Sequence, residues 1–412
     1  MKFDWFLKKT EISHPVSDLT WDSRPLVVHV INNLGVGGAE RFLVQLMHAQ
    51  LARGWRVGVV TLVEPNPLTH DIYGSGILYR GCGRKRLNDP RLLFDLIGIL
   101  QHLRPDVVHT HLFYADTFGA VAARLAGIRA ILSTEHSTEG WALSRRRRLA
   151  MRWSARWVRQ IVAVSDAVRE RTAERLRVPV QQIDVVPNGI DLEPFAQATP
   201  LPRKDLGLEA GDFVLGCVGR MVESKGYATL LRALSRLGDL EAGTSQTRLR
   251  LLMVGEGPDR GALQAQAEES GIGPRVQWLG LRHDVARLLK TIDLFVMPSS
   301  YEGHSIALLE AMAAGRACLV SDLPEITETT GASAVRVPAG DEAAIAAALR
   351  ALAEDPSRRE ALGAQAREVA GRFSIGTASE SYLRLYARLL DDTASRSSSA
   401  NRRRAAADSG PT

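Results

Sequence analysis

The sequence predicts an α/β protein with two domains, each a parallel sheet covered on both faces by helices. The chain has 412 residues, which is enough for roughly two to three domains that each bury a core. Short apolar runs rich in β-branched residues alternate with segments of helical periodicity. The alternation is interrupted once, by a proline-bearing stretch at 193–210, and then begins again. This repeated β-α alternation is typical of doubly wound parallel sheets.

The first domain is expected over residues 25–192, after an irregular leader at 1–24. Parallel strands are covered on both faces and therefore read as continuous apolar runs rather than as alternating ones. Such runs predict strands at 26–31, 57–62, 106–110, 130–133 and 161–164. Helical spacing between these runs predicts helices at about 39–52, 91–103, 115–126 and 166–177.

The second domain is expected over residues 211–376, after a linker at 193–210. Its strands are predicted at 213–218, 250–254, 276–279, 294–297 and 317–320. Three helices are expected near the end of the chain, at about 341–353, 356–371 and 377–391, followed by a disordered tail at 392–412 that is rich in Ser, Arg and Ala. Two such domains joined by one linker are expected to face each other across a cleft at the carboxyl ends of their strands.

Composition and the chain start predict a water-soluble protein of a reducing compartment. Hydrophobic residues make up 45% and charged residues 24% of the chain, as in an ordinary globular protein. Cys82, Cys217 and Cys318 form no CxxC pair and have no metal-ligand spacing. The first residues lack the apolar core of a signal peptide, and no stretch approaches the roughly 20 apolar residues that span a bilayer. We therefore expect a cytoplasmic protein.

Positive charge is concentrated in the first half of the chain. Residues 1–190 hold 26 Lys and Arg against 17 Asp and Glu, whereas the net charge of the whole chain is only +6. Trp141 to Arg159 contains seven arginines and no acidic residue. A basic amphipathic helix with tryptophans suits an anionic membrane surface, and the alternative is a core-packed helix with a solvated basic face. The residues expected to face the membrane are Arg145, Arg148, Arg152, Trp153, Arg156 and Trp157.

The segment from Glu302 to Glu310 carries the clearest chemical signal. Two carboxylates stand eight residues apart, and an apolar helical run at 306–314 follows the first of them. Free N–H groups in the first turn of a helix can hold a phosphate, and each carboxylate can accept hydrogen bonds from hydroxyls. A ligand that carries both phosphate and many hydroxyl groups suggests a nucleotide sugar.

Two loops at strand ends offer further phosphate contacts. Gly35-Val36-Gly37-Gly38 opens the first helix with spacing G-x-G-G, which differs from the dinucleotide fingerprint G-x-G-x-x-G. Gly219-Arg220 and Lys225-Gly226 follow the first strand of the second domain, and Arg with Lys suits a diphosphate. The alternatives are a tight turn for the first loop and a solvated basic loop for the second.

Histidines and an Asn-Gly pair complete the candidates. His111 and His136 lie just past strand ends and are expected to face the cleft, whereas His109, within a strand, is expected to be a core residue. Asn188 to Asp191 ends the first domain, and Asn-Gly is also an ordinary turn signal. The motifs H-E-x-x-H, G-x-S-x-G, G-x-x-x-x-G-K-[ST] and Asp-x-Asp are absent from the sequence, which disfavours hydrolase, kinase and metal-dependent transferase chemistry.

In order along the chain, these motifs resemble those of the retaining family-4 glycosyltransferases of the GT-B fold, in which two Rossmann-like domains face across a cleft. The resemblance covers about residues 26–330. It rests on these segments: Gly37 to Glu40, His109 to His111, Val186 to Asp191, Gly219-Arg220 with Lys225-Gly226, Val254 to Pro258, and Glu302 to Glu310.

The resemblance implies a role for each matching residue. His111 and Glu302 are expected at the transferred sugar and are the catalytic candidates. The donor-binding residues implied are Gly37, Gly38, Arg220, Lys225, Gly255, Gly303, His304, Ser305 and Glu310. Within this set, Arg220 and Lys225 would hold the diphosphate and Glu310 the ribose. The acceptor side would hold His136, Asn188 and Asp191, and no metal or cofactor is expected beyond the nucleotide sugar.

The function expected is transfer of a hexose from a nucleoside-diphosphate sugar to a saccharide or lipid-linked acceptor in cell-envelope polysaccharide or lipopolysaccharide synthesis. The protein would lie at the inner face of the cell membrane, because its first half is basic. The alternatives are a transferase for a soluble small acceptor, a nucleotide-sugar epimerase or phosphorylase of the same architecture, and a non-catalytic nucleotide-sugar-binding protein.

Overall fold

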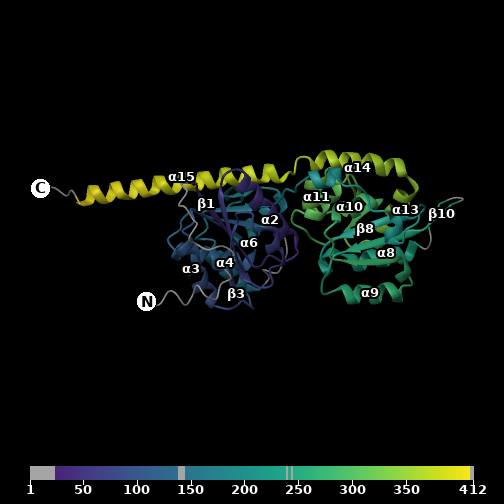
Figure 1. The fold of residues 1–412 in the computed structure, drawn as a ribbon, viewed down its shortest axis with the longest axis horizontal. Helices are drawn as coiled ribbons and strands as arrows, with labels where there is room; N and C mark the ends of the chain where they lie inside the picture. The colour runs from purple at the N-terminus through teal and green to yellow at the C-terminus, as the bar shows by residue number, and fades with distance from the viewer. Residues whose placement is uncertain (1–23, 138–143, 238–239, 243–244, 409–412) are drawn as a thin grey trace. The chain divides into compact units, whose positions relative to one another are not determined.

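The computed structural model describes residues 24–137, 144–237, 240–242 and 245–408. The predicted leader lies outside these residues except for Arg24, and so does Trp141. The chain forms two compact units, each described here by itself (Figure 1). Unit 1 comprises the residues up to Pro187 together with those from Ala378 onward, and unit 2 comprises Asn188–Thr377.

Unit 1 is built on a seven-stranded parallel sheet with the order β3-β2-β1-β4-β5-β6-β7. The strands are β1 Leu26–Ile31, β2 Arg56–Val63, β3 Leu78–Arg84, β4 Val107–His111, β5 Ile131–Glu135, β6 Gln160–Ala163 and β7 Ile183–Val185. The helices of this unit are α2 Gly38–Ala52, α3 Arg91–Leu103, α4 Phe113–Leu125, α5 Arg145–Ser154 and α6 Asp166–Leu176, with 3-10 turns η2 Pro67–Asp71 and η4 Val180–Gln182. Helix α3 shows why they pack: Leu92, Leu96 and Leu100 recur every four residues and form its buried face.

Unit 2 contains a six-stranded parallel sheet with the order β12-β11-β8-β13-β14-β15 and a separate antiparallel pair β9-β10. The strands are β8 Phe213–Val218, β9 Leu240–Ala242, β10 Ser245–Thr247, β11 Leu249–Val254, β12 Val276–Gly280, β13 Leu294–Met297, β14 Ala317–Ser321 and β15 Val335–Val337. The helices are α7 Glu193–Gln197, α8 Tyr227–Leu237, α9 Arg260–Glu269, α10 Val285–Thr291, α11 Ile306–Ala313, α12 Pro324–Thr330, α13 Glu342–Glu354 and α14 Pro356–Ala370, with 3-10 turns η5 Arg203–Leu206, η6 Glu223–Lys225 and η7 Gly273–Arg275. Both sheets have the doubly wound arrangement predicted from the sequence.

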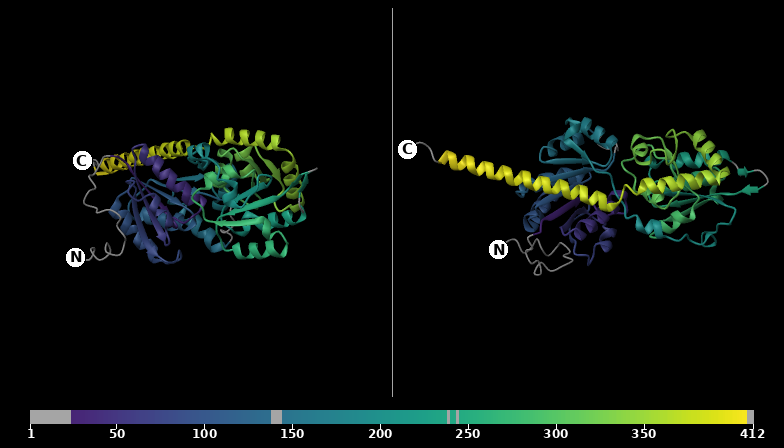
Figure 2. Two further views of the ribbon diagram at one scale, coloured as in Figure 1. Left: turned by 45° about the vertical axis from the view of Figure 1, so that its right-hand side comes forward. Right: turned by 90° about the horizontal axis from the view of Figure 1, so that it is seen from above.

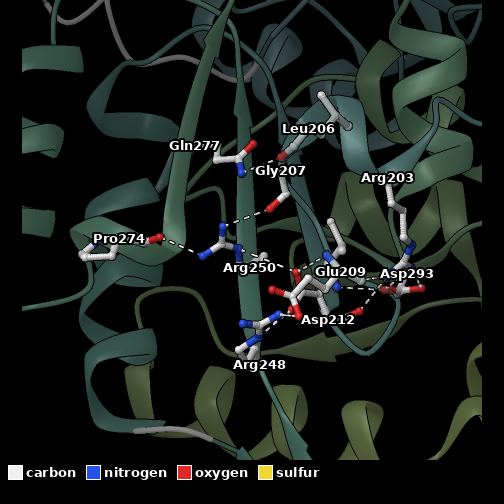
Figure 3. Close-up of polar contacts among 11 residues, drawn as sticks. Arg203, Leu206, Gly207, Glu209, Asp212, Arg248, Arg250, Pro274, Gln277 and Asp293 are labelled. Carbon is white, nitrogen blue, oxygen red and sulfur yellow. Dashed lines mark hydrogen bonds and ion pairs between the residues drawn. The ribbon is translucent and has the colours of Figure 1, made fainter.

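The segment predicted as a linker, 193–210, is held to unit 2 by ion pairs (Figure 3). Arg203 binds both carboxylate oxygens of Asp293, at 2.9 and 3.0 Å. The buried carboxylate of Asp212 accepts the Nε–H of Arg248 at 3.1 Å and the backbone N–H of Glu209 at 2.8 Å. Arg203 and Asp293 are 90 residues apart, so composition alone suggested a free linker. The first unit accordingly ends at Pro187 rather than at residue 192.

The last helix differs from the prediction of a helix at 377–391 and a disordered tail at 392–412. Helix α15 runs from Ile375 to Asp408 and is continuous in both views of Figure 2. The tail contains many Ala and Arg residues, which have high helix propensity, although few of its residues are apolar. Neither α15 nor any other helix in the described part of the chain is long and apolar enough to cross a membrane.

Candidate active site

The donor-binding candidates of unit 2 gather at the carboxyl ends of β8 and β13. These strands pair with each other, and the strand order reverses between them. Ligands of doubly wound sheets bind just beyond the strands at such a reversal. The loop after β8 and the loop after β13 touch there, since the backbone N–H of Ser300 donates to the carbonyl of Ser224 at 2.8 Å.

Lys225 and Glu302 form the centre of this site. The Nζ of Lys225 lies 2.6 Å from Oε1 of Glu302, and the hydroxyl of Ser299 donates to the same oxygen at 2.8 Å. The backbone N–H of Glu302 donates to Oε1 of Glu325 at 3.0 Å. Glu302 is 8% exposed and Glu325 only 3%. The structure thus joins two residues that the sequence assigned to different parts of the donor, and it holds Glu302 by two contacts to its carboxylate and one to its backbone N–H.

Arg220 is the open cation of the site. It is exposed, and within the described residues its guanidinium has no protein partner. Gly255 allows the loop that carries Arg220 to approach closely. Gly255 has φ +130°, and a Cβ on it would stand 2.0 Å from the carbonyl oxygen of Gly219, the residue before Arg220. Gly255, predicted to touch the donor, therefore allows two backbone loops to meet. Its observed contact positions the loop that carries Arg220.

The start of α11 is organised by its N-cap. Ser305 caps the helix, with its hydroxyl accepting the N–H of Leu308 at 3.5 Å and donating to the sulfur of Met297 at 3.3 Å. Gly303, just before it, is buried. Glu310 is also buried, in the second turn of the same helix.

His304 and Asn188 form a second support for this loop. The Nδ2 of Asn188 donates to the carbonyl of His304 at 2.9 Å, and the imidazole of His304 packs on Phe373 with ring centres 4.9 Å apart. Burial lowers the pKa of His304 to about 4, so the ring is neutral at pH 7. The His304 side chain therefore offers the site no positive charge.

The expectation that Asn188 and Asp191 lie at the end of the first domain was wrong. Both belong to unit 2, where Asn188 is buried and Asp191 is exposed. Oδ1 of Asp191 accepts the backbone N–H of Glu193 at 3.2 Å, at the start of α7. Asn-Gly is an ordinary turn signal in a sequence, and the contact of Asn188 with a loop more than a hundred residues away leaves no local signal.

The glycine loop of unit 1 has an acidic side chain across it. Helix α2 begins at Gly38, with Gly37 as a cap that contributes no side-chain hydrogen bond. A Cβ on Gly37 would stand 2.3 Å from Oε2 of Glu40, so the carboxylate folds back over this residue. Gly38 is exposed. An incoming phosphate would meet the Glu40 carboxylate at this helix start.

Three buried histidines of unit 1 and the half-buried His136 form a network at the reversal point of its sheet. His29 on β1 stands beside His109 on β4, and His111 ends β4. Nε2 of His111 lies 3.0 Å from Nδ1 of His29, and Nδ1 of His111 lies 3.0 Å from Nε2 of His136. The ring of His111 was expected to face a cleft. It is instead fully buried, and both of its nitrogens contact other histidines.

Burial keeps these rings neutral. It lowers the pKa of His29 and His136 to about 4 and that of His109 and His111 well below the ordinary value. The prediction of His109 as a core residue is confirmed, because it is fully buried and its ring nitrogens contact the hydroxyls of Tyr386 at 2.6 Å and Thr134 at 2.8 Å. His29 was not singled out, since one histidine in an apolar strand does not reveal which strand lies beside it.

Comparisons with known proteins decide the family. Residues 36–194 match the model of Glycosyltransferase Family 4, and residues 212–355 match that of Glycosyl transferases group 1. The chain belongs to these glycosyltransferases. Its two sheets are the Rossmann-like domains of a GT-B fold, as the motifs predicted.

Individual proteins similar to this glycosyltransferase support the same family assignment. It is 30% identical over 249 residues to the Escherichia coli UDP-Gal:alpha-D-GlcNAc-diphosphoundecaprenol alpha-1,3-galactosyltransferase, covering 58% of this chain and 63% of that one. It is 29% identical to the lipopolysaccharide core biosynthesis glycosyltransferase LpsD of Rhizobium meliloti, covering 85% of this chain and 95% of that one. The crystal structure of Anabaena Alr3699/HepE in complex with UDP and glucose has the same fold, with a TM-score of 0.76 at 18% identity, and the match covers 89% of this chain and 100% of that one.

The arginine-rich helix of the glycosyltransferase is partly exposed and partly core. On α5, Leu149 is 63% and Trp153 50% exposed. Arg145 and Arg156 are exposed as predicted, while Arg148 is half-buried.

Two residues of the predicted membrane face are directed elsewhere. Trp157 packs against the core of unit 1 with the guanidinium of Arg124 5.7 Å from its ring centre. Arg152 is half-buried, and its Nε–H donates to the carbonyl of Arg175 at 2.9 Å, in the last turn of α6. The helix ends at Ser154, so the periodicity assumed up to residue 159 does not hold for Trp157.

Proposed function

We propose that this glycosyltransferase moves a hexose from a nucleoside-diphosphate sugar to a saccharide or lipid-linked acceptor, with retention of the anomeric configuration. The observation that carries the proposal is the group formed by Lys225, Glu302 and Ser299, together with the exposed Arg220 in the same loop after β8 as Lys225. It combines two cations with a fixed carboxylate at the point of the sheet where ligands bind.

In this proposal Arg220 and Lys225 bind the diphosphate of the donor. Arg220 supplies a planar fork and Lys225 a compact charge. The backbone N–H groups at the start of α11, including those of His304 and Ser305, add donors for phosphate or sugar oxygens. Glu310, one helix turn further in, accepts hydrogen bonds from the ribose.

Catalysis then depends on charge at the leaving group. As the bond to the sugar breaks, negative charge grows on the diphosphate, and fixed cations stabilise it. Glu302 does not act as a nucleophile, because Lys225 and Ser299 already hold its Oε1. It orients the sugar hydroxyls, and the departing phosphate assists removal of the acceptor proton on the same face. That course retains the configuration and requires no metal.

His111 contributes from unit 1 by accepting a hydrogen bond from a sugar hydroxyl. Its Nδ1 now contacts His136, so His136 must move aside when the sugar binds. His136, half-buried at the end of β5, then lies on the acceptor side of the sugar.

We further propose that the acceptor is lipid-linked and that the protein works at the inner face of the cell membrane. The Escherichia coli relative is named for a diphosphoundecaprenol acceptor, and the Rhizobium relative for lipopolysaccharide core synthesis. The exposed residues of α5, Arg145, Arg146, Leu149 and Trp153, together with Arg156 just after the helix, join positive charge with an apolar tip. Such a face suits anionic lipid headgroups.

The decisive experiment is a thermal-shift screen of UDP-, GDP- and ADP-hexoses, followed by turnover with GlcNAc-diphospho-lipid and with free saccharides. We expect stabilisation by one nucleotide class, and fast turnover only with an acceptor. NMR of the product should show the same anomeric configuration as the donor. An inverted product would overturn the retaining mechanism, and fast conversion of the donor without any acceptor would favour an epimerase.

A further inference from the structure

A chain of hydrogen bonds runs through the core of unit 1, and the side-chain amide of Gln50 determines its direction. Oε1 of Gln50 can only accept, so the Nε2–H of His29 donates to it at 2.8 Å. The other end of the amide donates from Nε2 to the hydroxyl of Tyr386 at 3.1 Å. Both Gln50 and Tyr386 are fully buried, so no water competes for these bonds.

The direction set at Gln50 is transmitted to His111. Because His29 is neutral and carries its proton on Nε2, its Nδ1 is a lone pair that must accept. The partner at 3.0 Å, Nε2 of His111, therefore carries the proton. His111 is neutral as well, so its own Nδ1 is a lone pair and accepts the Nε2–H of His136 at 3.0 Å.

The other branch agrees with this direction. The hydroxyl of Tyr386 accepts from Gln50 and donates to Nδ1 of His109 at 2.6 Å. Nε2 of His109 then carries the proton and donates to the hydroxyl of Thr134 at 2.8 Å. All four histidines have the same tautomer, and no hydrogen bond in the chain has two donors or two acceptors.

We propose that His29 is a positioning residue for His111: it holds the Nε2–H of His111 and so leaves Nδ1 of His111 as the hydrogen-bond acceptor. The inference rests on the proposed contact of His111 with the sugar. A ring fixed in this tautomer accepts from a hydroxyl, and it repels a carbonyl or phosphate oxygen at the same position. His136 Nε2–H occupies that acceptor while no sugar is present.

A metal ion is the competing occupant of this cluster. Nitrogens of His29, His109 and His111 lie within 4.8 Å of one another. Zinc binds imidazole through a lone pair, at about 2.0–2.1 Å. In the directed chain, however, the facing nitrogen of His111 carries a proton, and both nitrogens of His109 are bonded to hydroxyls. The hydrogen-bonded arrangement uses every one of these groups, so we favour it over a metal site.

The first test needs no substrate. Long-range ¹H–¹⁵N spectra of the full chain, labelled at the histidine ring nitrogens, should show His111 protonated at Nε2 and bare at Nδ1 at pH 7. Assignment uses the His111→Gln variant, which removes one ring. A His111 ring protonated at Nδ1 would overturn the inference, and so would a stoichiometric zinc ion that survives dialysis against EDTA.

The second test uses a matched pair of variants. His29→Asn places an amide oxygen near the position of Nδ1, whereas His29→Phe keeps a flat ring without an acceptor. We expect His29→Phe to lose the Nε2–H signal of His111 and to lower kcat by ~10–100-fold with little change in donor KM, the scale of a misplaced catalytic group. His29→Asn should keep the tautomer and recover most of kcat. The exposed His102→Phe, on α3, serves as the control.

The outcomes separate the inference from the function on which it rests. Turnover is measured with the nucleotide hexose selected by the screen. If His111→Ala keeps full activity, the proposed role of His111 fails. If His111→Ala is inactive while His29→Phe keeps normal turnover and an unchanged tautomer, only the role of His29 fails. If His29→Phe does not fold, the His29→Asn variant is used instead. Loss of the Nε2–H tautomer of His111 in folded His29→Asn would equally overturn the role of His29.

Discussion

Lys225 and Glu302 are each other's partner before any donor binds. The Lys225 ammonium is partly exposed, while the carboxylate is almost fully buried and also accepts from Ser299. A buried charge that loses its partner is costly, since neither water nor protein compensates it. Lys225 is therefore expected to have two functions, to hold the Glu302 carboxylate in place and to present positive charge, whereas the exposed side chain of Arg220 has only the second.

This difference predicts distinct behaviour of two alanine variants. Arg220→Ala should lower turnover by ~10²–10³-fold, the scale of losing one transition-state donor, and leave the melting temperature unchanged. Lys225→Ala should lower turnover at least as much and also destabilise unit 2 by about 1–3 kcal/mol, because a buried hydrogen-bonded acceptor loses its cation. Turnover and thermal melting of both variants test this.

The control is the double variant Lys225→Ala/Glu302→Gln. It should recover part of the stability lost in Lys225→Ala, because the amide needs no cation. Near-normal turnover in Arg220→Ala and Lys225→Ala would exclude the diphosphate role of both.

The buried histidines predict a loss of stability in mild acid. The pKa of His29 and of His304 is lowered by burial to about 4, against about 6.5 in the unfolded chain. Between these values the unfolded state binds protons that the folded state does not, so stability is complete above pH 6.5 and falls as the pH falls toward 4. Each of these two rings should lower the free energy of unfolding by about 2 kcal/mol when the pH is lowered from 7 to 5.

Urea titrations at pH 7 and pH 5 measure this effect. Between the two pH values, the free energy of unfolding of the His29→Asn variant should fall by about 2 kcal/mol less than that of the parent chain. Replacement of the exposed His102 by Asn should leave the dependence unchanged. An identical pH dependence in His29→Asn and the parent would show that His29 does not stay neutral in the fold.

Sequence reasoning pointed to candidate residues at strand ends, but not to the long-range contacts that support them. Arg220 and Lys225 could be predicted because a loop after a buried strand lies where ligands bind. Glu325, Asn188 and His29 act through contacts with segments distant in the chain. Their local surroundings are an ordinary helix start, an Asn-Gly turn and an apolar strand, and none of these indicates a partner.

Among the secondary-structure elements, strands with a neighbour on both sides were predicted more accurately than edge strands. Strands β1, β8 and β13, which have neighbours on both sides, match the predicted ranges to the residue. The missed parallel strands β3, β7 and β15 are all edge strands. Edge strands are short or polar, because one side faces no partner strand. Their apolar signal is correspondingly weak, as the sequence Leu-Tyr-Arg-Gly-Cys-Gly-Arg of β3 shows.

The exposed arginines of helix α5 lead to a prediction about membrane binding. Its exposed arginines should bind vesicles that contain phosphatidylglycerol. Each basic residue near an anionic surface contributes about 1 kcal/mol, so the double variant Arg145→Glu/Arg146→Glu should weaken vesicle binding by at least ~30-fold. Cosedimentation at constant salt measures this.

A matched control distinguishes docking from a general effect of charge. Arg350 and Arg358 are also exposed, on α13 and α14 of unit 2. The double variant Arg350→Glu/Arg358→Glu changes net charge by the same amount and should bind vesicles as the parent does. Equal loss in both double variants, or binding unaffected in the first, would contradict docking through α5.

At the scale of the whole molecule, unit 1 is built from segments that precede and follow unit 2 in the sequence. The chain leaves unit 1 after Pro187 and re-enters it at Ala378. Tyr382 and Tyr386 of α15 are fully buried there, and their hydroxyls contact Thr134 and His109. The core that holds the histidine network is therefore completed only by the last helix, whereas unit 2 is one continuous segment.

This arrangement predicts that only unit 2 folds cooperatively when each unit is produced as a separate, continuous fragment. A fragment of residues 188–377 should melt cooperatively by itself, because it contains its whole core. A fragment of residues 24–187 should not, since loss of one buried aromatic side chain costs about 3–5 kcal/mol and this fragment lacks two. Adding a peptide of residues 378–395 should restore a cooperative transition by circular dichroism, and the same peptide with both tyrosines replaced by alanine should not. Cooperative melting of 24–187 without the peptide would mean that α15 only covers a core that is already complete.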